Sequence, residues 1–352
     1  MTKESANSSK KPLCKVCEKP MQRYGFYQSG KQKWYCPKCK KVFSKKRKTF
    51  SFKQDVKGFA DWLLNKETAT RTASKSRSTF YRKNKKLWLI NPVIDVTGEV
   101  YKVIIIDAKF LSNKTAVLLA VTPDFSVGYH WSRGGERADE YEALLSKLPA
   151  PKYLVCDGNK AILSVCRRLW PKTRIQRCFF HIERYIEHKI GKRPTTEAGA
   201  ALKNILYSFM TVKTKLGAKR AELKFWRLFE KYRAFIHEKI YRKDVPPQDA
   251  NKREYKPWWY AHKNLLAAYN HVISVIKNNQ LWWWIEDNIP RTANDLEGGY
   301  NARIAELLRC HRGANLEHQK RIVEWYLLSR SQFGIDGFLS DYLSQRPTFF
   351  DT

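Results

Sequence analysis

Short apolar runs separated by turn-forming residues occupy the middle of the chain. They predict β-strands at residues 101–107, 115–122, 126–131, 153–157 and 174–178. Apolar residues at helical spacing predict helices at 136–148 and 159–169, between the later strands. The order is three strands, a helix, a strand, a helix and a strand, which indicates a mixed α/β sheet covered by helices.

Helical periodicity continues on both sides of this region. Residues 52–65 predict an amphipathic helix, and after an Ala/Thr segment at 68–73 either Ser76 or Ser78 can cap a second helix with a basic exposed face. Two such helices are typical of a DNA-reading helix-turn-helix, although small basic helical hairpins are also common. Farther along the chain, we expect helices at 202–216, 221–240 and 263–277 and an exposed loop at 238–247.

The charge of the chain narrows the class of partner. The 352 residues include 67 Lys and Arg against 33 Asp and Glu, a net charge of +34. Residues 1–100 hold 25 basic and 7 acidic side chains, so +18 of that charge lies there. This excess makes a polyanion the expected partner, with nucleic acid first and an anionic membrane surface second.

The chain lacks the patterns that would favour a membrane. No apolar run approaches the roughly 20 residues that cross a bilayer, and the N-terminal residues lack the apolar segment of a signal peptide. No segment has the pattern of an amphipathic anchor. We therefore expect a cytoplasmic, nucleoid-associated protein with no membrane partner.

Four of the eight cysteines form two C-x-x-C pairs. Cys14 and Cys17 are separated by 18 residues from Cys36 and Cys39, the spacing of a zinc ribbon. Aromatic residues between the pairs can supply the small apolar cluster that such a module needs. A thioredoxin-like redox pair is the alternative, but it would have to explain two pairs and lacks the surrounding βαβ pattern. We expect a structural zinc ion with four protein ligands.

Two acidic residues close two of the predicted buried strands. Asp107 ends YKVIIID and Asp157 ends YLVCD, and the predicted order places these strands side by side. Either residue alone could cap the next turn. Two converging carboxylates repel one another, and a divalent cation relieves this repulsion while providing Lewis acidity for phosphodiester chemistry. A third acid on a later helix is expected, with Asp295 and Glu297 as candidates.

Five sequence segments carry a resemblance to a known family. They are IDAKF at 106–110, CDGNKA at 156–161, RCFFHI at 177–182, NDLEGGYNARI at 294–304 and LLRCHRG at 307–313. In this order and spacing the chain resembles bacterial insertion-sequence transposases of the DDE type, in the Mutator-related group. The resemblance covers about residues 100–330. It implies an α/β ribonuclease-H-like catalytic core with an all-α insertion domain, preceded by a small zinc ribbon and a helix-turn-helix domain.

The resemblance also implies a set of site residues. Asp107, Asp157 and Glu297 match the catalytic, metal-binding triad, which uses two Mg²⁺ (or Mn²⁺) ions, and Asp295 becomes a neighbour. The residues that match site-organising positions are Cys178, His181, Asn294 and Asn301. For Cys178 and His181, simple packing is the alternative role.

We expect the domains to follow this order. The ranges are 1–48 for the zinc ribbon with its basic tail, 49–95 for the helix-turn-helix, 96–184 for the first part of the core, 185–290 for the helical insertion, and 291–352 for the last part of the core with C-terminal helices. The residues expected to contact DNA are Lys45, Lys46, Arg47, Lys48, Arg77, Ser78, Thr79, Tyr81, Arg82, Lys85, Trp258 and Trp259. The two tryptophans are candidates for stacking on a flipped or unpaired base near the cleavage site, although packing is the commoner role of such residues.

Three functions are compatible with these patterns. The favoured one is a DNA transposase that binds terminal inverted repeats through residues 1–90, acts on target DNA as a dimer or larger assembly, and catalyses strand cleavage and strand transfer by a 3′-hydroxyl. A domesticated, non-catalytic DNA-binding regulator would not need three converging acids. A ribonuclease-H-like nuclease without strand transfer leaves the zinc-ribbon and helix-turn-helix segments less well explained.

Overall fold

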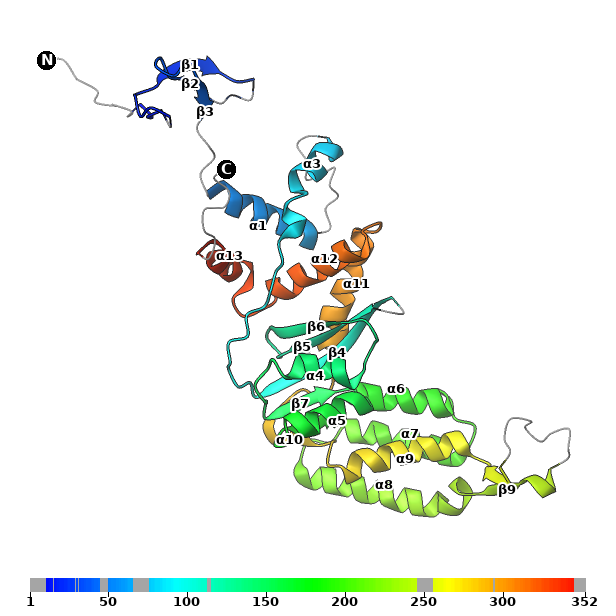
Figure 1. Ribbon diagram of the computed structural model, residues 1–352. Helices are drawn as coiled ribbons and strands as arrows, with labels where there is room; N and C mark the ends of the chain where they lie inside the picture. The colour runs from blue at the N-terminus through cyan, green and yellow to red at the C-terminus, as the bar shows by residue number, and fades with distance from the viewer. Residues whose placement is uncertain are drawn as a thin grey trace. The chain divides into compact units, whose positions relative to one another are not determined.

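The computed structural model describes residues 11–14, 16–28, 30, 32–44, 50–65, 76–112, 115–245, 256–293 and 295–344 (Figure 1). Within these ranges a few side chains lie outside the description, among them those of Arg77, Asp295 and Glu297. The chain divides into two compact units, residues 1–61 and 62–352, and each unit is considered separately below.

The first unit contains a small antiparallel sheet. Its strands are β1 (Gln22–Phe26), β2 (Gln32–Tyr35) and β3 (Val42–Ser44), in the order β1-β2-β3. Cys14, Met21 and Cys36 are its buried core, and Trp34 and Phe43 pack against them. So small an apolar core cannot supply much stability, which is why modules of this size commonly depend on a metal.

A mixed five-stranded sheet organises the second unit, and the prediction of a mixed α/β sheet is confirmed. The strands are β4 (Val103–Ser112), β5 (Thr115–Val121), β6 (Ser126–Ser132), β7 (Tyr153–Cys156) and β8 (Arg174–Arg177), in the order β6-β5-β4-β7-β8. The first three strands are antiparallel neighbours, whereas β4, β7 and β8 run parallel. The central apolar runs are buried on both faces, as is usual for strands covered by helices.

Helices pack against both sides of the sheet. α4 (Ala138–Leu145) and α5 (Lys160–Leu169) share one apolar cluster with alternate residues of the strands, including Ile106 and Cys156. On the other side, α12 (Leu316–Ser329) is joined to β6 by side chains. The Trp131 indole donates to Glu324 over 2.9 Å, and the Ser126 hydroxyl donates to the Leu327 carbonyl over 2.5 Å.

The strand bounds differ from the sequence prediction at one important point. β4 does not end at Asp107 but continues through five more residues, which pair with β5 in a hairpin. The prediction ended the strand at the acid because the apolar run YKVIIID ends there. Asp107 is instead half-buried in the middle of a long strand, where the neighbouring β7 has already ended.

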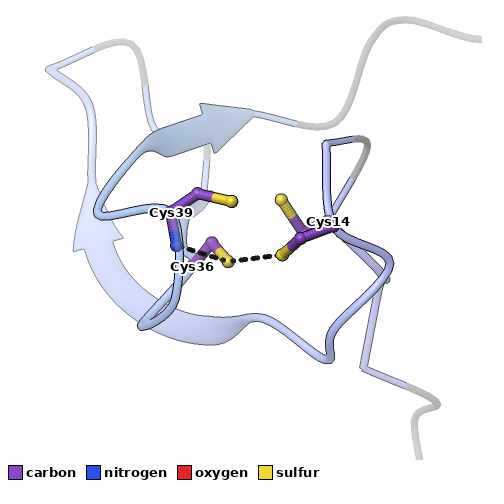
Figure 2. Close-up of side chains that lie close together, drawn as sticks. Cys14, Cys36 and Cys39 are labelled. Carbon is purple, nitrogen blue, oxygen red and sulfur yellow. Dashed lines mark hydrogen bonds between the residues drawn. The ribbon is translucent and has the colours of Figure 1, made fainter.

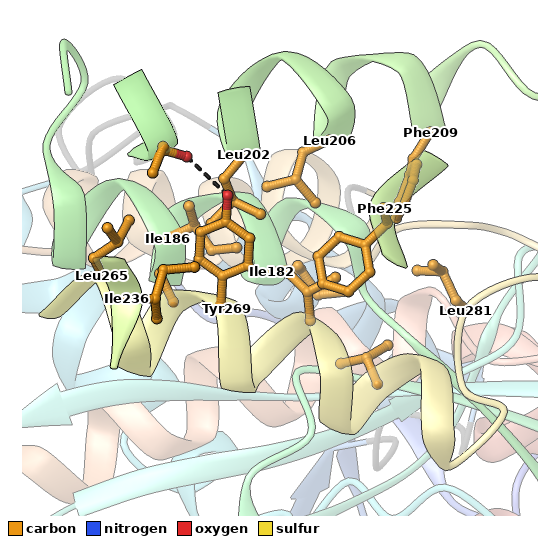
Figure 3. Close-up of a cluster of buried hydrophobic side chains, with 14 of the residues drawn as sticks. Ile182, Ile186, Leu202, Leu206, Phe209, Phe225, Ile236, Leu265, Tyr269 and Leu281 are labelled. Carbon is orange, nitrogen blue, oxygen red and sulfur yellow. Dashed lines mark hydrogen bonds between the residues drawn. The ribbon is translucent and has the colours of Figure 1, made fainter. Parts of the chain in front are cut away.

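Four helices build a separate apolar cluster. They are α6 (Phe179–Ile190), α7 (Glu197–Met210), α8 (Lys215–Ile236) and α9 (Lys263–Lys277), and their shared core runs from Phe179 to Leu281 (Figure 3). Tyr269 lies in this core with its hydroxyl hydrogen-bonded to the Ala198 carbonyl over 2.9 Å. The cluster therefore starts within α6, which is separated from β8 by a single residue, Cys178.

The predicted helix at 263–277 is found as α9, but the bounds predicted for the other two helices, 202–216 and 221–240, are wrong. α7 and α8 both begin earlier than expected, because Thr196 and Thr214 cap them by accepting from the N–H of Gly199 and Gly217. α8 also ends before residue 240. The residues that follow it form β9 (Lys239–Tyr241), which pairs with β10 (Trp258–Tyr260), and η2 (Arg242–Asp244) occupies the remainder of the described loop.

The segment predicted as a helix-turn-helix is described in part. α1 (Phe50–Leu64) and α3 (Arg77–Asn84) match the two predicted helices, whereas the predicted segment 68–73 lies outside the described residues. Of the two predicted caps the structure uses Ser76, whose hydroxyl accepts from the Thr79 N–H. The short η1 (Leu87–Leu89) follows, and the Trp62 ring packs edge-on against Phe80 at 4.9 Å.

The last elements that the structure describes are helical, and one of them is the segment matching the third acid. In chain order they are the short α10 (Trp283–Asp287), that segment as the wide π-helical turn η3 (Asp295–Asn301), α11 (Ala302–Cys310), α12 and α13 (Gly334–Ser344). None of the described helices has the length and apolar character needed to cross a membrane.

Candidate active site and metal centre

Of the two aspartates predicted from sequence, Asp107 lies on β4 and Asp157 is the first residue after β7, the parallel neighbour of β4. β4 and β7 pair with Val103 opposite Tyr153 and Ile105 opposite Val155, and this register, continued two residues beyond the last pair, matches Asp107 with Asp157. Adjacent strands are about 4.8 Å apart. The structure therefore brings these two predicted residues together where β7 gives way to a loop.

The direction of the pKa shift of Asp107 agrees with a position close to Asp157. Burial raises the pKa of the Asp107 carboxyl above its ordinary value, and the negative charge of Asp157 raises it further. The Ala108 N–H, the His181 side chain and the Asn301 amide act in the opposite direction and lower that pKa. The surroundings of Asp107 therefore disfavour the ionised form of its carboxyl group.

Asn301 connects the sheet to the segment that matches the third acid. Its Nδ2 donates to Asp107 Oδ2 over 2.7 Å, although 194 residues separate the two in sequence. The residue is 8% exposed, and its Oδ1 is buried without a hydrogen-bond partner among the described residues. A buried amide oxygen left unsatisfied on a side chain that contacts the Asp107 carboxylate is the type of ligand that a divalent cation prefers.

The turn η3 carries Glu297 and places its backbone against β4. Leu296, Tyr300 and Asn301 are buried in this turn, whereas Gly298 and Gly299 are exposed. Wide π-helical turns are rare and occur frequently at functional sites. The predicted Asn294 and the side chain of Glu297 lie outside the described residues, so the third member of the triad stays a prediction.

Cys178 joins the sheet to the chain segment that leads into η3. Its Sγ accepts from the Ala293 N–H over 3.2 Å, and its own N–H donates to the Cys156 carbonyl over 2.8 Å. The adjacent Phe179 N–H donates to the Arg291 carbonyl over 3.1 Å. These bonds fix residues 291–293 beside the strand that ends before Asp157, which supports a site-organising role for Cys178. His181, also predicted as site-organising, is half-buried and lies close enough to influence Asp107.

Sequence reasoning missed one acidic residue at this site. Glu136 lies in the turn before α4, where it accepts a hydrogen bond from the Tyr141 hydroxyl over 2.7 Å. Burial raises the pKa of Glu136, and the charges of Asp157 and Asp107 raise it further. The sequence prediction had placed Glu136 inside a helix, which actually begins at Ala138. The Gly134-Gly135 pair just before it was the available signal for a turn.

A second missed residue is Arg177, which is buried under the Asp157 loop. Its guanidinium is mostly enclosed, and its Nε donates to the Asp157 carbonyl over 3.0 Å. It fills the space beside Gly158, where an added Cβ would lie 1.7 Å from Arg177 Nε. The loop that holds Asp157 therefore has its shape set by a glycine and an arginine together.

The four predicted zinc ligands come together in the first unit. Their sulfur atoms all lie within 4.8 Å of one another, and the Cys17 and Cys36 sulfurs are 3.6 Å apart, close to the ~3.8 Å edge expected for a tetrahedral zinc site with 2.3 Å bonds. Figure 2 shows the labelled sulfur atoms of Cys14, Cys36 and Cys39 facing one another. The four thiols could bind a structural zinc ion. Among the described residues no other group of three or more His, Cys, Asp and Glu side chains is this tight.

The two cysteine pairs have the same backbone geometry. The Cys14 N–H donates to the Lys19 carbonyl and the Cys36 N–H to the Lys41 carbonyl, and the residue four positions after each of these cysteines, Glu18 or Lys40, has a positive φ. Backbone N–H groups of Val16 and Cys17 lower the pKa of Cys14 to about 7, which favours the thiolate form that binds metal.

Removal of metal from this unit is expected to abolish its fold. Treatment with a strong chelator should release one zinc ion per chain and change the fluorescence of Trp34, which packs on the cysteine cluster, because the apolar core is too small to hold the sheet alone. Cys36→Ser should lower the zinc content, whereas the exposed Cys310→Ser should not. Full zinc content in Cys36→Ser would contradict this assignment.

The predicted DNA-contacting residues are only partly described. Lys45, Lys46, Arg47 and Lys48 lie outside the described residues, as does the side chain of Arg77. Ser78, Tyr81 and Arg82 are exposed on α3, and Thr79 is half-buried. Lys85 is exposed directly after this helix. Trp258 and Trp259 lie in the β9–β10 hairpin beyond the C-terminal end of α8, away from the sheet in Figure 1, so the structure does not bring them to the aspartates.

The last turn of α1 contacts α11 and the residue after it. Arg303 donates from Nη2 to the Leu64 carbonyl over 2.6 Å, and the His311 Nε2 is 2.9 Å from the Leu63 carbonyl. Arg303 lies two residues after Asn301. The end of the first predicted DNA-binding helix and the segment that reaches Asp107 therefore belong to one packed region.

Comparison with known proteins gives no family for this chain: no protein-family model and no curated protein matches it.

Proposed function

We propose that this chain is a DNA transposase of the DDE type, with a ribonuclease-H-like core, a helical insertion, a zinc ribbon and a helix-turn-helix. The observation that carries the proposal is the Asp107–Asp157 pair, one on β4 and the other directly after its parallel neighbour β7, with Asn301 from the third-acid segment bonded to Asp107. The net charge of +34 and the exposed basic residues of α3 support a nucleic-acid substrate.

The donor set fits Mg²⁺ or Mn²⁺. Two carboxylates and a buried, unsatisfied amide oxygen are hard oxygen ligands, and the raised pKa of Asp107 marks a site where a cation would stabilise the ionised form. In the proposal Asp107, Asp157 and Glu297 hold the ions. When bound, the metal supplies Lewis acidity and charge neutralisation for phosphodiester displacement.

Four residues of the chain have separate positioning roles at the proposed site. Asn301 orients Asp107 through its amide N–H, and Asn159 fixes Asp157 by donating its backbone N–H to Oδ1 over 2.9 Å. Cys178 and Phe179 hold the segment that leads to Glu297. The site first positions a water for strand cleavage, and afterwards the freed 3′-hydroxyl for attack on target DNA.

The test uses DNA from the two ends of the element that encodes the chain. With Mg²⁺ we expect cleavage at the terminal repeat and covalent joining of the freed 3′ end to a target duplex, visible as a product longer than either substrate strand. Binding without cleavage would favour the regulator. Cleavage of branched DNA without joining would favour the nuclease.

A further inference from the structure

The outer face of α8 carries a stripe of basic side chains. The helix contains seven Lys and Arg against two Glu, and all seven basic residues are exposed. Arg220, Lys224, Arg227 and Lys231 follow the i, i+4, i+7, i+11 spacing that places residues on one side of a helix. The opposite side of α8, with Ala218, Ala221, Phe225 and Ile236, is buried in the four-helix cluster.

Three residues of this stripe have no ionic partner in the described part of the chain. The side chains of Arg220, Lys224 and Arg227 form no ion pair or hydrogen bond with other residues that the structure describes, whereas Lys231 pairs with Glu197 over 3.2 Å. The two acids of α8 are engaged elsewhere, Glu222 with the Trp282 indole and Glu230 with Arg233. The positive charge of the stripe is therefore available to an external partner.

The spacing of the charges suits a nucleic-acid backbone. Arg220 and Arg227 are seven residues apart, which corresponds to about 10 Å along a helix axis. The grooves of a duplex, which are bordered by the phosphate backbones, are roughly 6 and 12 Å wide. An extended row of unpaired cations on a rigid helix matches such a row of phosphates and offers no pattern for reading bases.

An anionic membrane fits this face less well. An interfacial helix inserts a continuous apolar side between lipids. The apolar side of α8 is already used in the bundle core, and its exposed face offers Leu216 and Leu223 as large aliphatic residues among the seven basic ones.

We propose that the exposed face of α8, centred on Arg220, Lys224 and Arg227, is a binding surface for the sugar–phosphate backbone of duplex DNA. The inference rests on the proposed function, since it names where the helical part of a DNA-processing enzyme holds its substrate. The surface is separate from the helix-turn-helix and from the two aspartates, and it contributes affinity without sequence preference.

The test is the salt dependence of binding to a duplex of arbitrary sequence, measured by fluorescence anisotropy with the full chain in magnesium-free buffer. The triple variant R220Q/K224Q/R227Q should reduce the slope of log K against log salt by about 3, since each phosphate contact contributes about 0.9. At moderate salt its affinity should fall on the order of 100-fold. All three side chains are exposed, so the fold should be retained, which the Tm checks.

A matched control removes the same charge elsewhere. K147Q/R168Q/K172Q changes three exposed basic residues around α4 and α5 and should change the slope by less than 1. An unchanged slope in the α8 variant, or an equal loss in the control, would overturn the proposal. So would loss of binding to anionic vesicles in the α8 variant without loss of duplex binding. Because the measurement needs no strand cleavage, its result is independent of whether the chain is a transposase.

Discussion

Asp157→Asn is expected to reduce Mg²⁺-dependent strand cleavage on the order of 10³-fold, because removing one metal-binding carboxylate removes several kcal/mol of transition-state stabilisation. The substitution keeps the shape of the side chain. An asparagine oxygen can still accept the Asn159 N–H that now bonds Asp157 Oδ1, so the loop should keep its conformation. The measurement is cleavage of a terminal-repeat duplex, followed by gel electrophoresis.

The control for this variant is Asp124→Asn, which changes an exposed aspartate in the turn between β5 and β6. It should cleave as well as the unmodified chain. Duplex binding should be the same in both variants, because neither changes a basic surface. Cleavage by Asp157→Asn within a few-fold of the unmodified chain would remove Asp157 from the catalytic set.

Gly158→Ala is expected to destabilise the second unit by about 3 kcal/mol or more. Gly158 has a φ of +78°, a conformation that costs a non-glycine residue about 1–2 kcal/mol. The added Cβ would also lie 1.7 Å from Nε and 1.9 Å from Cζ of Arg177, so the buried guanidinium must leave the Asp157 carbonyl. The free energy of unfolding in urea measures the effect.

Gly313→Ala separates the two contributions. Gly313 also has a positive φ, +91°, but a Cβ there would meet no atom within 4 Å. It should therefore show the backbone cost alone, a smaller loss than that of Gly158→Ala. In an Arg177→Gln background the additional cost of Gly158→Ala should shrink, since the guanidinium that it displaces is gone. Equal losses in the two glycine variants would contradict the steric account.

The sheet was predictable because its strands are short apolar runs that are buried on both faces. The runs ending in Asp107 and Asp157 also predicted that the two carboxylates lie on neighbouring strands. What the runs did not predict is the length of β4, because residues 108–112 are held in the strand by pairing with β5 and not by their own composition. Long-range pairing likewise places residues 239 and 240, the end of a predicted helix, in the strand β9.

The contacts that complete the site depend on long-range packing. Glu136 and Asp107 are brought together by the register of β6, β5 and β4, which no local pattern specifies. Arg177 reads in sequence as a polar residue in a short strand, and its burial follows from the glycine opposite it. The helix caps at Thr196 and Thr214 could have been predicted because threonine is a favoured N-cap residue, but apolar periodicity alone placed both helix starts too late.

The central claim is that Asp107 and Asp157 hold divalent cations together with the third-acid segment. The most direct test is titration of the zinc-saturated chain with Mn²⁺, with free Mn²⁺ followed by electron paramagnetic resonance. The unmodified chain should take up Mn²⁺ saturably, and the double variant D107N/D157N should lose this uptake while keeping its zinc. Equal uptake by the two proteins, or none by the unmodified chain, would contradict the claim.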